Sequence, residues 1–548
     1  MDKSDETKKK LFALLLKEEG LDISSTRIVK SRKEKDPLPL SFAQQRLWFL
    51  DQLAPDNPFY NAPFVLRFTG MLNTTALRQS LYEIIRRHEA LRTKFIFQHT
   101  QPVQQILPLS EMSPPSLPLL DLQALPRKAR GATLQRLIDT EAHRPFDLTR
   151  DLLLRATLVR LEEHQHMLLL TLHHITSDGW SQGIVHGELS ALYNAFVQGQ
   201  PSPLTPLPIQ YADFALWQHQ WLQGEILERH LQYWRDQLRN LPVLELPTDV
   251  PRPAIETFQG AICYMSIPRE LTQQLKELSQ SAGATLFMTL LTAFATLLLH
   301  YSGQADLPIG SPIANRTQRE VEGLIGFFVN TLVLRCDLTG NPPFLEALQR
   351  IREMTLEAYA HQDLPFERLV EALQPERTLR HNPLCQVLFQ LQNAPRQPLS
   401  LQNLTVRHLQ IDNQTARFDL VVSLIETEQG LINRWEYTTD LFTAPTIERM
   451  SWHYLHLLES IVAQPEQRLL DLPLLTKTER SALLERRNPS HVPVEGPEER
   501  SDPLLSCSAK QVYSQKNQLF PLVLFASDLR WAFRQQDPSA HYSEIVAS

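Results

Sequence analysis

The most constraining feature of the sequence is a strand pattern that passes into a helix pattern through a loop rich in polar side chains. The run MLLLTL at 167–172 is apolar and strand-like, and HHITSDGW follows it at 173–180 without a spacer. Between residues 184 and 196, apolar residues recur with helical spacing. The loop therefore occupies a strand-to-helix turn.

The same mixture of strand and helix patterns continues along the chain, without the regular spacing of repeated strand–helix–strand units. This alternation predicts mixed α/β layers rather than a barrel. The segment Leu286–Tyr301 is too short for a bilayer span and is expected to be a buried core helix. Strand patterns occur at 63–70, 167–172, 261–267, 327–338 and 418–426, and helix patterns occur at 74–87, 211–238, 270–280, 286–301, 343–360 and 447–462.

At 548 residues, the chain exceeds the size at which a single hydrophobic core keeps growing, so at least two globular units are expected. The proline-rich stretch 241–258 has the composition of a crossover between them. Near the start, the sequence predicts an amphipathic helix that ends near Gly20, followed by a polar linker. The predicted organisation is an N-terminal helix and linker at 1–36, a first subdomain at 37–240, the crossover at 241–258, a second subdomain at 259–488 and an unassigned tail at 489–548.

Charge and cysteine content argue against several classes of protein. The formal net charge is -7, with basic residues spread through both halves, so no nucleic-acid surface is expected. The four cysteines form no CxxC pair, which gives no sign of a disulfide framework or a zinc site and fits a reducing cytoplasm. The N-terminal apolar stretch is shorter than the core of a secretory signal, and no membrane association is predicted.

The two adjacent histidines can be interpreted without a metal ion or a covalent intermediate. Neighbouring residues of an extended segment point to opposite faces, so His173 and His174 are not expected to share a metal ion. The sequence has no HExxH motif and no GxSxG elbow, which leaves a zinc site and a serine nucleophile without support. A neutral imidazole can instead accept a proton or a hydrogen bond from a reacting group.

A purely structural interpretation of the loop also stands at this point. A histidine at a strand end is commonly a hydrogen-bonded core residue, and an Asp-Gly pair is common turn chemistry. The loop taken alone does not separate this interpretation from a catalytic one.

The loop matches the HHxxxDG motif of the condensation domains of nonribosomal peptide synthetases, and six other segments resemble motifs of that family in the same order. The resemblance covers about residues 37–488. The six segments are SFAQQRLWFL at 41, RHEALRTKF at 87, YADFALW at 211, IGFFVNTLVLR at 325, HQDLPFERLVE at 361 and RHNPLCQVLF at 380.

The resemblance implies both a fold and a reaction. The fold would be α/β, with mixed α+β layers in two chloramphenicol-acetyltransferase-like subdomains that form a V-shaped pseudodimer. The active site would lie in a tunnel between the subdomains, which the phosphopantetheine arms of a donor and an acceptor peptidyl carrier protein enter from two sides. The implied reaction is amide-bond formation between an acyl or peptidyl thioester and the amine of an aminoacyl thioester. Adjacent adenylation and thiolation modules are further expected partners, and the chain itself is expected to bind no cofactor and no metal.

The resemblance also implies roles for the residues of the loop. His174 matches the family's second histidine, which acts either as a general base or as a group that positions the amine. Asp178 matches a structural aspartate that pairs with an arginine of the second half, and Arg316 is the candidate partner. Gly179 would allow close approach of the substrate and lend its N–H to the oxyanion, and His173 is assigned to the fold. The pattern HHxxxDGW-S is typical of members that join an L-configured donor to an L-configured acceptor.

Other residues in the family-type segments receive structural interpretations. For five of these residues, hydrogen bonds in caps, turns and domain contacts are at least as good an explanation as contact with substrate. They are Arg46, Arg92, Asp213, Asn330 and Asp363. Helical spacing predicts core packing for Trp48, Trp217, Trp221 and Trp234.

The segment PLLTKTERSALLERRN, from residue 473, resembles the usual lead-in to an adenylation domain, and no such domain follows it in this sequence. One hypothesis is therefore that the chain is a truncated or frame-shifted piece of a larger synthetase. Two alternatives to an active condensation enzyme are an inactive fragment that only interacts with carrier proteins, and an acyltransferase that uses coenzyme A thioesters. The DFGWG segment typical of the second alternative is absent.

Overall fold

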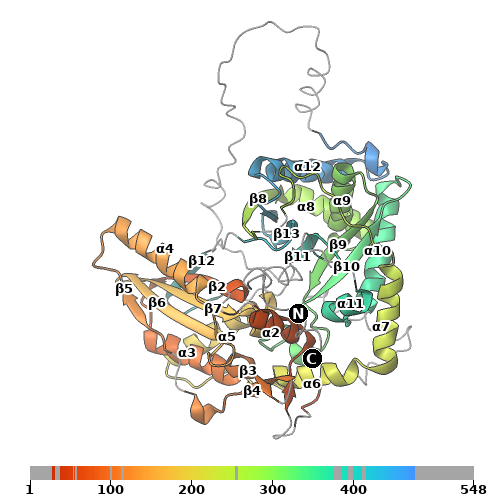
Figure 1. Cartoon of the computed structure of the whole chain (residues 1–548). Coiled ribbons are helices and arrows are strands. Elements are labelled where there is room, and N and C mark those ends of the chain that lie inside the picture. Colours follow the sequence, from red (N-terminus) through yellow and green to blue (C-terminus); the bar gives the residue numbers. More distant parts are fainter. Residues whose placement is uncertain are drawn as a thin grey trace.

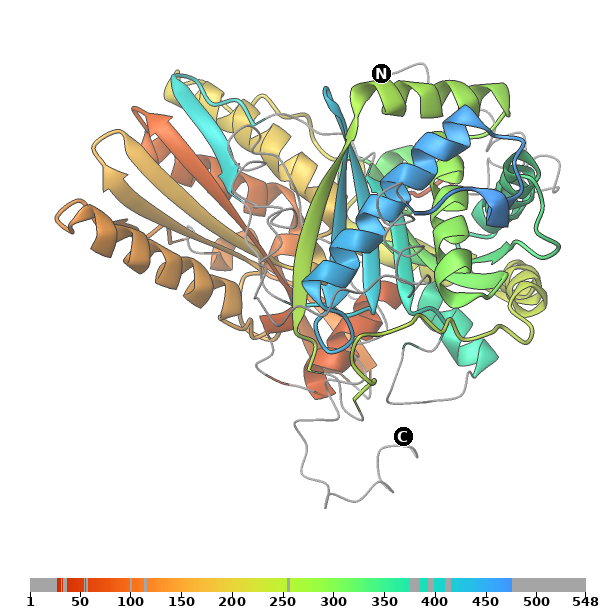
Figure 2. The same ribbon diagram turned by 90° about the horizontal axis from the view of Figure 1, so that it is seen from above.

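The computed structural model describes residues 27–475, apart from 31, 33–36, 54, 56–57, 99–100, 113–115, 254–256, 375–381, 383, 393–398 and 410–414. Within this part, two bodies of sheet and helix lie side by side and splay apart in a V when they are seen from above (Figure 2). The first half of the chain forms most of the body on the left, and the second half forms most of the body on the right (Figure 1). The predicted N-terminal helix and the tail at 489–548 lie outside the described residues.

The first body is built on a five-stranded sheet in the order β12-β2-β7-β6-β5. The apolar run 167–172 lies in β7, where Leu168 and Leu170 join the core under α3 and α5, while Met167 and Leu169 join a second core under α4. Helices therefore cover both faces of this sheet. Its elements are β2 (Asn61–Gly70), α3 (Thr74–Arg87), β5 (Leu119–Asp121), α4 (Arg127–His143), β6 (Leu154–Glu162), β7 (Gln165–His173), α5 (Gly179–Val197) and β12 (Leu404–Leu409).

The first half of the chain also forms a smaller sheet and one further helix. The sheet has the order β1-β4-β3 and consists of β1 (Leu38–Pro39), β3 (Thr93–Gln98) and β4 (Gln101–Ile106). Helix α2 (Phe42–Leu53) begins with a reciprocal cap, in which Ser41 and Gln44 each accept a hydrogen bond at 3.1 Å from the other's backbone N–H.

The second body is built on a six-stranded sheet in the order β10-β9-β11-β13-β14-β8. Every residue of its helix α9 from Met288 to Leu299 is buried, which confirms the predicted core helix. Among the described residues, no single helix is long and apolar enough to span a membrane, and only the pair α8–α9, bent by 104°, meets the criteria of length and composition. The elements of this body are β8 (Gly260–Pro268), α8 (Arg269–Ser281), α9 (Leu286–Ser302), β9 (Asp306–Ile313), β10 (Asn330–Asp337), α10 (Phe344–Ala360), α11 (Phe366–Leu373), β11 (Val387–Gln392), β13 (Leu420–Thr427), β14 (Gly430–Thr438) and α12 (Ala444–Ala463).

The single long helix expected at 211–238 is two helices in the structure. Helix α6 (Tyr211–Trp221) ends before Leu222, and α7 (Gly224–Gln237) begins at a glycine with φ of 55°, a backbone conformation that glycine adopts without steric penalty. The break directs α7 onto the second body, where Trp234 enters the core and is 1 % exposed. Core packing is thus confirmed for Trp234.

The two bodies exchange elements, so neither is a continuous piece of the chain. Strand β12 comes from the second half and pairs antiparallel with β2 of the first body. Helix α7 comes from the first half and contacts α11 of the second body, beside the contact between α2 and α11 (Figure 1). The crossover at 241–258 therefore separates the two halves in chain order only. Elements from both sides of it pack into each body.

Part of the predicted linker packs against the first body. Ile28 is buried in a cluster with Ala90 and Tyr211. Arg32 forms an ion pair with Glu89, with nitrogen–oxygen distances of 2.5 and 3.0 Å. At these positions the segment is a docked part of the fold, which the polar composition of 21–36 did not predict.

Candidate active site

His173 ends strand β7 and is held in the core of the first body. Its Nδ1 accepts a hydrogen bond from the N–H of Ile175 at 3.1 Å, and its ring packs against Tyr60 and Phe146. Burial is the largest reason that the pKa of His173 is lowered to about 3. The side chain is therefore a neutral, structural group, in agreement with its assignment to the fold.

His174 follows in a short 3-10 turn and is 5 % exposed. Its Nδ1 lies 3.1 Å from the carbonyl oxygen of Ser177. Because a carbonyl only accepts, the ring proton of the neutral imidazole is on Nδ1 and the lone pair is on Nε2. No hydrogen bond to Nε2 is formed by the described residues. Burial, followed by the positive charge of Arg417, lowers the pKa of His174 to about 4, so the ring is neutral at pH 7.

Asp178 caps the helix that follows the loop. Its Oδ1 accepts hydrogen bonds from the N–H of Ser181 at 2.8 Å and from the Ser181 hydroxyl at 2.7 Å, as expected at the N-cap of α5. Its Oδ2 accepts the N–H of Phe328 at 3.1 Å. The carboxylate thus joins the loop of the first body to the segment that precedes β10.

The structure contains the expected ion pair between Asp178 and Arg316. Nη2 of Arg316 lies 3.1 Å from Oδ1 and 3.3 Å from Oδ2 of Asp178. Nη1 of Arg316 donates to the carbonyls of Val321 and Leu324 at 2.6 and 2.7 Å. The guanidinium therefore holds together the loop after β9, the segment before β10 and the start of α5.

Ser181 is a second centre of this network, and the sequence interpretation missed it. Its hydroxyl lies 2.9 Å from the carbonyl of Gly326, accepts the Gly326 N–H at 3.1 Å and accepts Nη2 of Arg316 at 3.0 Å. The sequence did contain a signal, because a serine three residues after a helix-capping aspartate is placed to share that cap.

The segment around Phe327 forms one wall beside His174. The Tyr211 hydroxyl donates to the Phe327 carbonyl at 2.5 Å and lies 2.8 Å from the Ser41 hydroxyl. A Cβ on Gly326 would lie 2.0 Å from the Tyr211 ring, so only glycine allows this approach. These contacts fix the backbone at Phe327, whose ring centroid is 6.4 Å from that of His174 in an edge-to-face arrangement.

Gly179 is the first residue of α5 and is only partly buried. The first N–H groups of a helix have no partner within the helix and carry a partial positive charge. The N–H of Gly179 therefore lies at the positive end of α5, five residues after His174 in the chain. Within the described part of the chain, no cluster of three or more His, Cys, Asp or Glu residues could hold a metal ion.

Four of the five other motif residues make the structural contacts expected of them. The contacts join Arg46 to Glu367 at 2.9 Å, Arg92 to the Leu107 carbonyl at 2.5 Å, Asp213 to the Gln210 N–H at 2.8 Å, and Asn330 to the carbonyls of Gln362 and Leu364 at 2.8 Å. Asp363 differs, because none of the described residues forms a hydrogen bond or an ion pair with its carboxylate.

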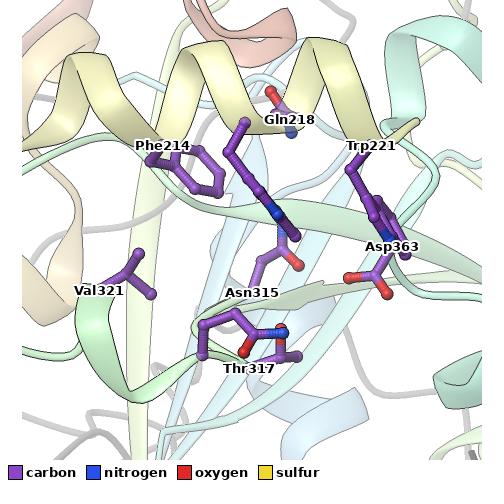
Figure 3. A pocket seen from close by; sticks show the side chains of 9 residues that line it. Phe214, Gln218, Trp221, Asn315, Thr317, Val321 and Asp363 are labelled. Carbon is purple, nitrogen blue, oxygen red and sulfur yellow. The ribbon is translucent and has the colours of Figure 1, made fainter. Parts of the chain in front are cut away.

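Asp363 instead lines a shallow pocket between α6 and the loop after β9 (Figure 3). A neighbouring pocket shares three of its lining residues, Phe214, Gln218 and Asn315, and is also lined by Phe327. Phe327, which lines this second pocket, has its ring centroid 6.4 Å from that of His174.

Two of the four tryptophans expected in the core line this pocket. Trp217 and Trp221 stack with ring centroids 5.3 Å apart and an interplanar angle of 12°, and both rings are partly exposed. Both side chains pack against the hydrophobic core, as predicted, but each is only partly buried and also lines the pocket. Trp48 is also only partly buried and stacks on the exposed Phe97.

The sequence model of the family described as Condensation domain matches residues 34–484. A linear gramicidin synthase of Brevibacillus parabrevis is 48 % identical to the chain over 462 residues, which make up 84 % of this chain and 9 % of that protein. The chain therefore spans less than a tenth of the length of this relative.

Two solved structures share the arrangement of the two bodies. The X-domain from teicoplanin biosynthesis is 28 % identical, with a TM-score of 0.73, and the match covers 81 % of this chain and 99 % of that chain. The first condensation domain of the calcium-dependent antibiotic synthetase is 20 % identical, with a TM-score of 0.68, and the match covers 81 % of this chain and all of that chain. The predicted fold class, two chloramphenicol-acetyltransferase-like subdomains in a V, is confirmed.

Proposed function

The chain belongs to the condensation domains of nonribosomal peptide synthetases, which are amide-forming acyltransferases, and from this membership we propose how its site works. The donor is an acyl, aminoacyl or peptidyl thioester on one carrier protein, and the nucleophile is the amine of an aminoacyl thioester on another. The observation that supports this most directly is the lone pair of His174 Nε2, held on a loop that Asp178 and Arg316 fix.

The reaction needs no covalent intermediate on the protein. The amine nitrogen attacks the thioester carbon, a C–N bond forms, and the C–S bond breaks after the tetrahedral intermediate loses a proton from nitrogen. The departing pantetheine thiolate takes up a proton and leaves as a thiol. The protein then contributes orientation of the two arms and stabilisation of the charges that develop.

The low pKa of His174 favours a positioning role over that of a strong general base. An α-ammonium group has a pKa of about 8, so moving its proton to a histidine with a pKa of about 4 would be uphill by about 5 kcal/mol. Nε2 is instead suited to accept a hydrogen bond from the neutral amine and to orient its lone pair toward the thioester carbon. It takes the proton only after attack has made the nitrogen acidic.

The N–H of Gly179 is the candidate donor to the tetrahedral oxygen. It lies at the N-terminus of α5, where the helix dipole favours negative charge. Asp178 does not touch substrate in this scheme, because its oxygens are already engaged by Ser181, Arg316 and Phe328.

The remaining parts of the proposal concern partners and place. Donor and acceptor peptidyl carrier proteins deliver the substrates on phosphopantetheine, and adenylation and thiolation modules are neighbours in the assembly. The pattern HHxxxDGW-S supports L-configured donor and acceptor, and we place the reaction in the cytoplasm.

The test uses two carrier proteins, one loaded with an aminoacyl donor and one with an aminoacyl acceptor, followed by intact mass. The wild-type chain should transfer the donor to the acceptor carrier, and His174→Ala should lower the rate at least 100-fold. His143→Ala, at an exposed histidine of α4, is the matched control and should keep full activity.

Three results would contradict the proposal. Equal rates of wild type and His174→Ala would mean that His174 is dispensable. Transfer from coenzyme A thioesters to an alcohol would favour the other acyltransferase. No product from a broad panel of donors, with folded protein, would favour an inactive carrier-binding fragment.

A further inference from the structure

We infer that the pocket between α6 and the loop after β9 binds one organic cation, an alkylammonium or guanidinium group, as the side chain of an aminoacyl substrate. This inference rests on the proposed function only for the source of the cation. The chemistry of the site is argued from its lining residues, Phe214, Trp217, Gln218, Trp221, Asn315, Thr317, Gln318, Val321 and Asp363.

Two stacked indoles form one wall of the pocket. Trp217 and Trp221 are four residues apart on α6 and therefore lie on the same face of the helix. Both rings are partly exposed to the pocket, although an indole of this size is normally mostly buried. Aromatic faces of this kind attract ammonium and guanidinium groups through the ring quadrupole.

The Asp363 carboxylate points into the same space, below the Trp221 ring (Figure 3). Among the described residues no partner neutralises it, and burial raises its pKa to about 6. Asp178 and Glu367, by contrast, form ion pairs with Arg316 and Arg46. A half-buried carboxylate without a counter-charge is costly, and a bound cation would remove that penalty.

The remaining lining fits a single positive charge with several N–H donors. The lining contains one acidic residue and no basic residue. Thr317 and Gln318 supply side-chain oxygens that can accept N–H groups. Phe214 and Val321 close the apolar side, where the methylene stem of a lysine-like or arginine-like side chain would pack.

Asn315 ties this pocket to the reaction site. It has a φ of 50°, in the left-handed region that asparagine tolerates better than most residues. It also lines the second pocket, which reaches Phe327 beside His174. The next residue, Arg316, is fixed on Asp178. These contacts place the pocket beside the segments that hold the histidine loop, and for this reason we assign the cation to the side chain of a substrate.

The experiment has two arms. The first tests whether the pocket binds a cation, and the second tests whether that cation is the side chain of a substrate. In the first arm, saturation-transfer NMR with agmatine and n-butylammonium measures binding without any carrier protein. Wild-type chain should give a signal that Asp363→Asn and Trp221→Leu both lose, whereas Glu371→Gln, at an exposed acid of α11, should keep it. Circular dichroism and thermal unfolding verify that each variant is folded.

In the second arm, carriers bear lysine or its uncharged analogue norleucine, and arginine or its uncharged analogue citrulline, as donor or acceptor. Wild type should condense the cationic member of each pair at least tenfold faster in one of the two carrier positions. Asp363→Asn should reduce this ratio to about one, whereas Glu371→Gln should leave the ratio unchanged.

The outcomes are distinct. A signal in the first arm with no condensation at all would leave the cation pocket standing and contradict the proposed function. A signal in the first arm with equal rates in the second would mean that the pocket binds a free amine, which overturns the assignment to a substrate side chain. No signal for either cation, with equal rates for each substrate pair, would overturn the inference as a whole.

Discussion

Asp178 and Arg316 are 138 residues apart in the chain and meet in an ion pair in which each side chain is about 1 % exposed. One comes from the loop after β7 in the first body, and the other comes from the loop after β9 in the second. A charge pair this deeply buried is stable only when its polar atoms make further hydrogen bonds. Here each carboxylate oxygen of Asp178 accepts another hydrogen bond, and Nη1 of Arg316 donates two. The geometry of the histidine loop therefore depends on the contact between the two bodies.

Replacing Asp178 by asparagine should destabilise the protein by about 3 to 5 kcal/mol, because the buried charge of Arg316 would lose its counter-ion. Urea unfolding measures the change. Glu371→Gln removes the partner of Arg368 in an exposed pair and should change stability by less than about 1 kcal/mol. Similar losses in the two variants would contradict the structural role of the buried pair.

The rate of condensation should show no inflection near pH 6.5. With a pKa of about 4, His174 stays neutral throughout the range from pH 5.5 to 9, so the rate should follow the ionisation of the acceptor amine and level off above about pH 8. Single-turnover rates measured across this range check the expectation. An inflection near 6.5 that disappears in His174→Ala would show that this histidine titrates as a base.

The folded protein should lose stability steadily between pH 6.5 and pH 4. Burial lowers the pKa of His173 and His186 to about 3 and that of His174 and His230 to about 4. Unfolded histidines have a pKa of about 6.5, so in this window the unfolded chain binds more protons and is favoured as the pH falls, by up to about 1.4 kcal/mol per histidine and pH unit.

One group opposes this trend. The pKa of Asp363 is raised to about 6, so the folded state gains a proton there before the unfolded chain does, and four histidines outweigh it. Urea midpoints at pH 7, 6 and 5 should fall in that order, and His186→Leu should fall less steeply than wild type. A midpoint that does not change with pH would contradict the neutral, buried state of these histidines.

Gly326→Ala should destabilise the protein by about 1 to 3 kcal/mol and lower activity, because the new Cβ would lie 2.0 Å from the Tyr211 ring and displace the Phe327 wall beside His174. Gly323→Ala is the matched control in the same segment, since its Cβ would lie 3.8 Å from Leu207 in ordinary contact. Unfolding and single-turnover rates of both variants test this. If the two glycines tolerate alanine equally, the packing of Tyr211 does not set the position of Phe327.

Much of the fold was predictable because the periodicity of apolar residues is a local property. The run 167–172 lies in β7, the stripe after residue 180 lies in α5, and the apolar segment 286–301 lies in the buried α9. The exceptions lie where backbone geometry or distant pairing decides. The pattern at 211–238 is continuous, but the chain breaks at Gly224. Residues 306–313, for which no strand was predicted, form β9, which pairs with β10.

The candidate site was predictable in part for the same reason. The capping role of Asp178 follows from a spacing of three residues to Ser181, and a strand that ends at His173 leaves His174 on the loop. The partner of Asp178 came from a family resemblance, since no local pattern connects residues 178 and 316. Four other motif residues were expected to make structural contacts, and they do so. Asp363, in the same kind of motif, lines a pocket instead.

The sequence by itself determined where most strands and helices lie, where the strand-to-helix turn lies and which family the motifs resemble, because periodicity and motifs are properties of short segments of the chain. The tertiary structure alone decided that Arg316 reaches Asp178, that Nε2 of His174 keeps its lone pair, and that Trp217, Trp221 and Asp363 line one pocket. These features arise where elements from the two bodies meet. The energies that bring them together come from burial and charge pairing across long chain separations, which no local pattern records.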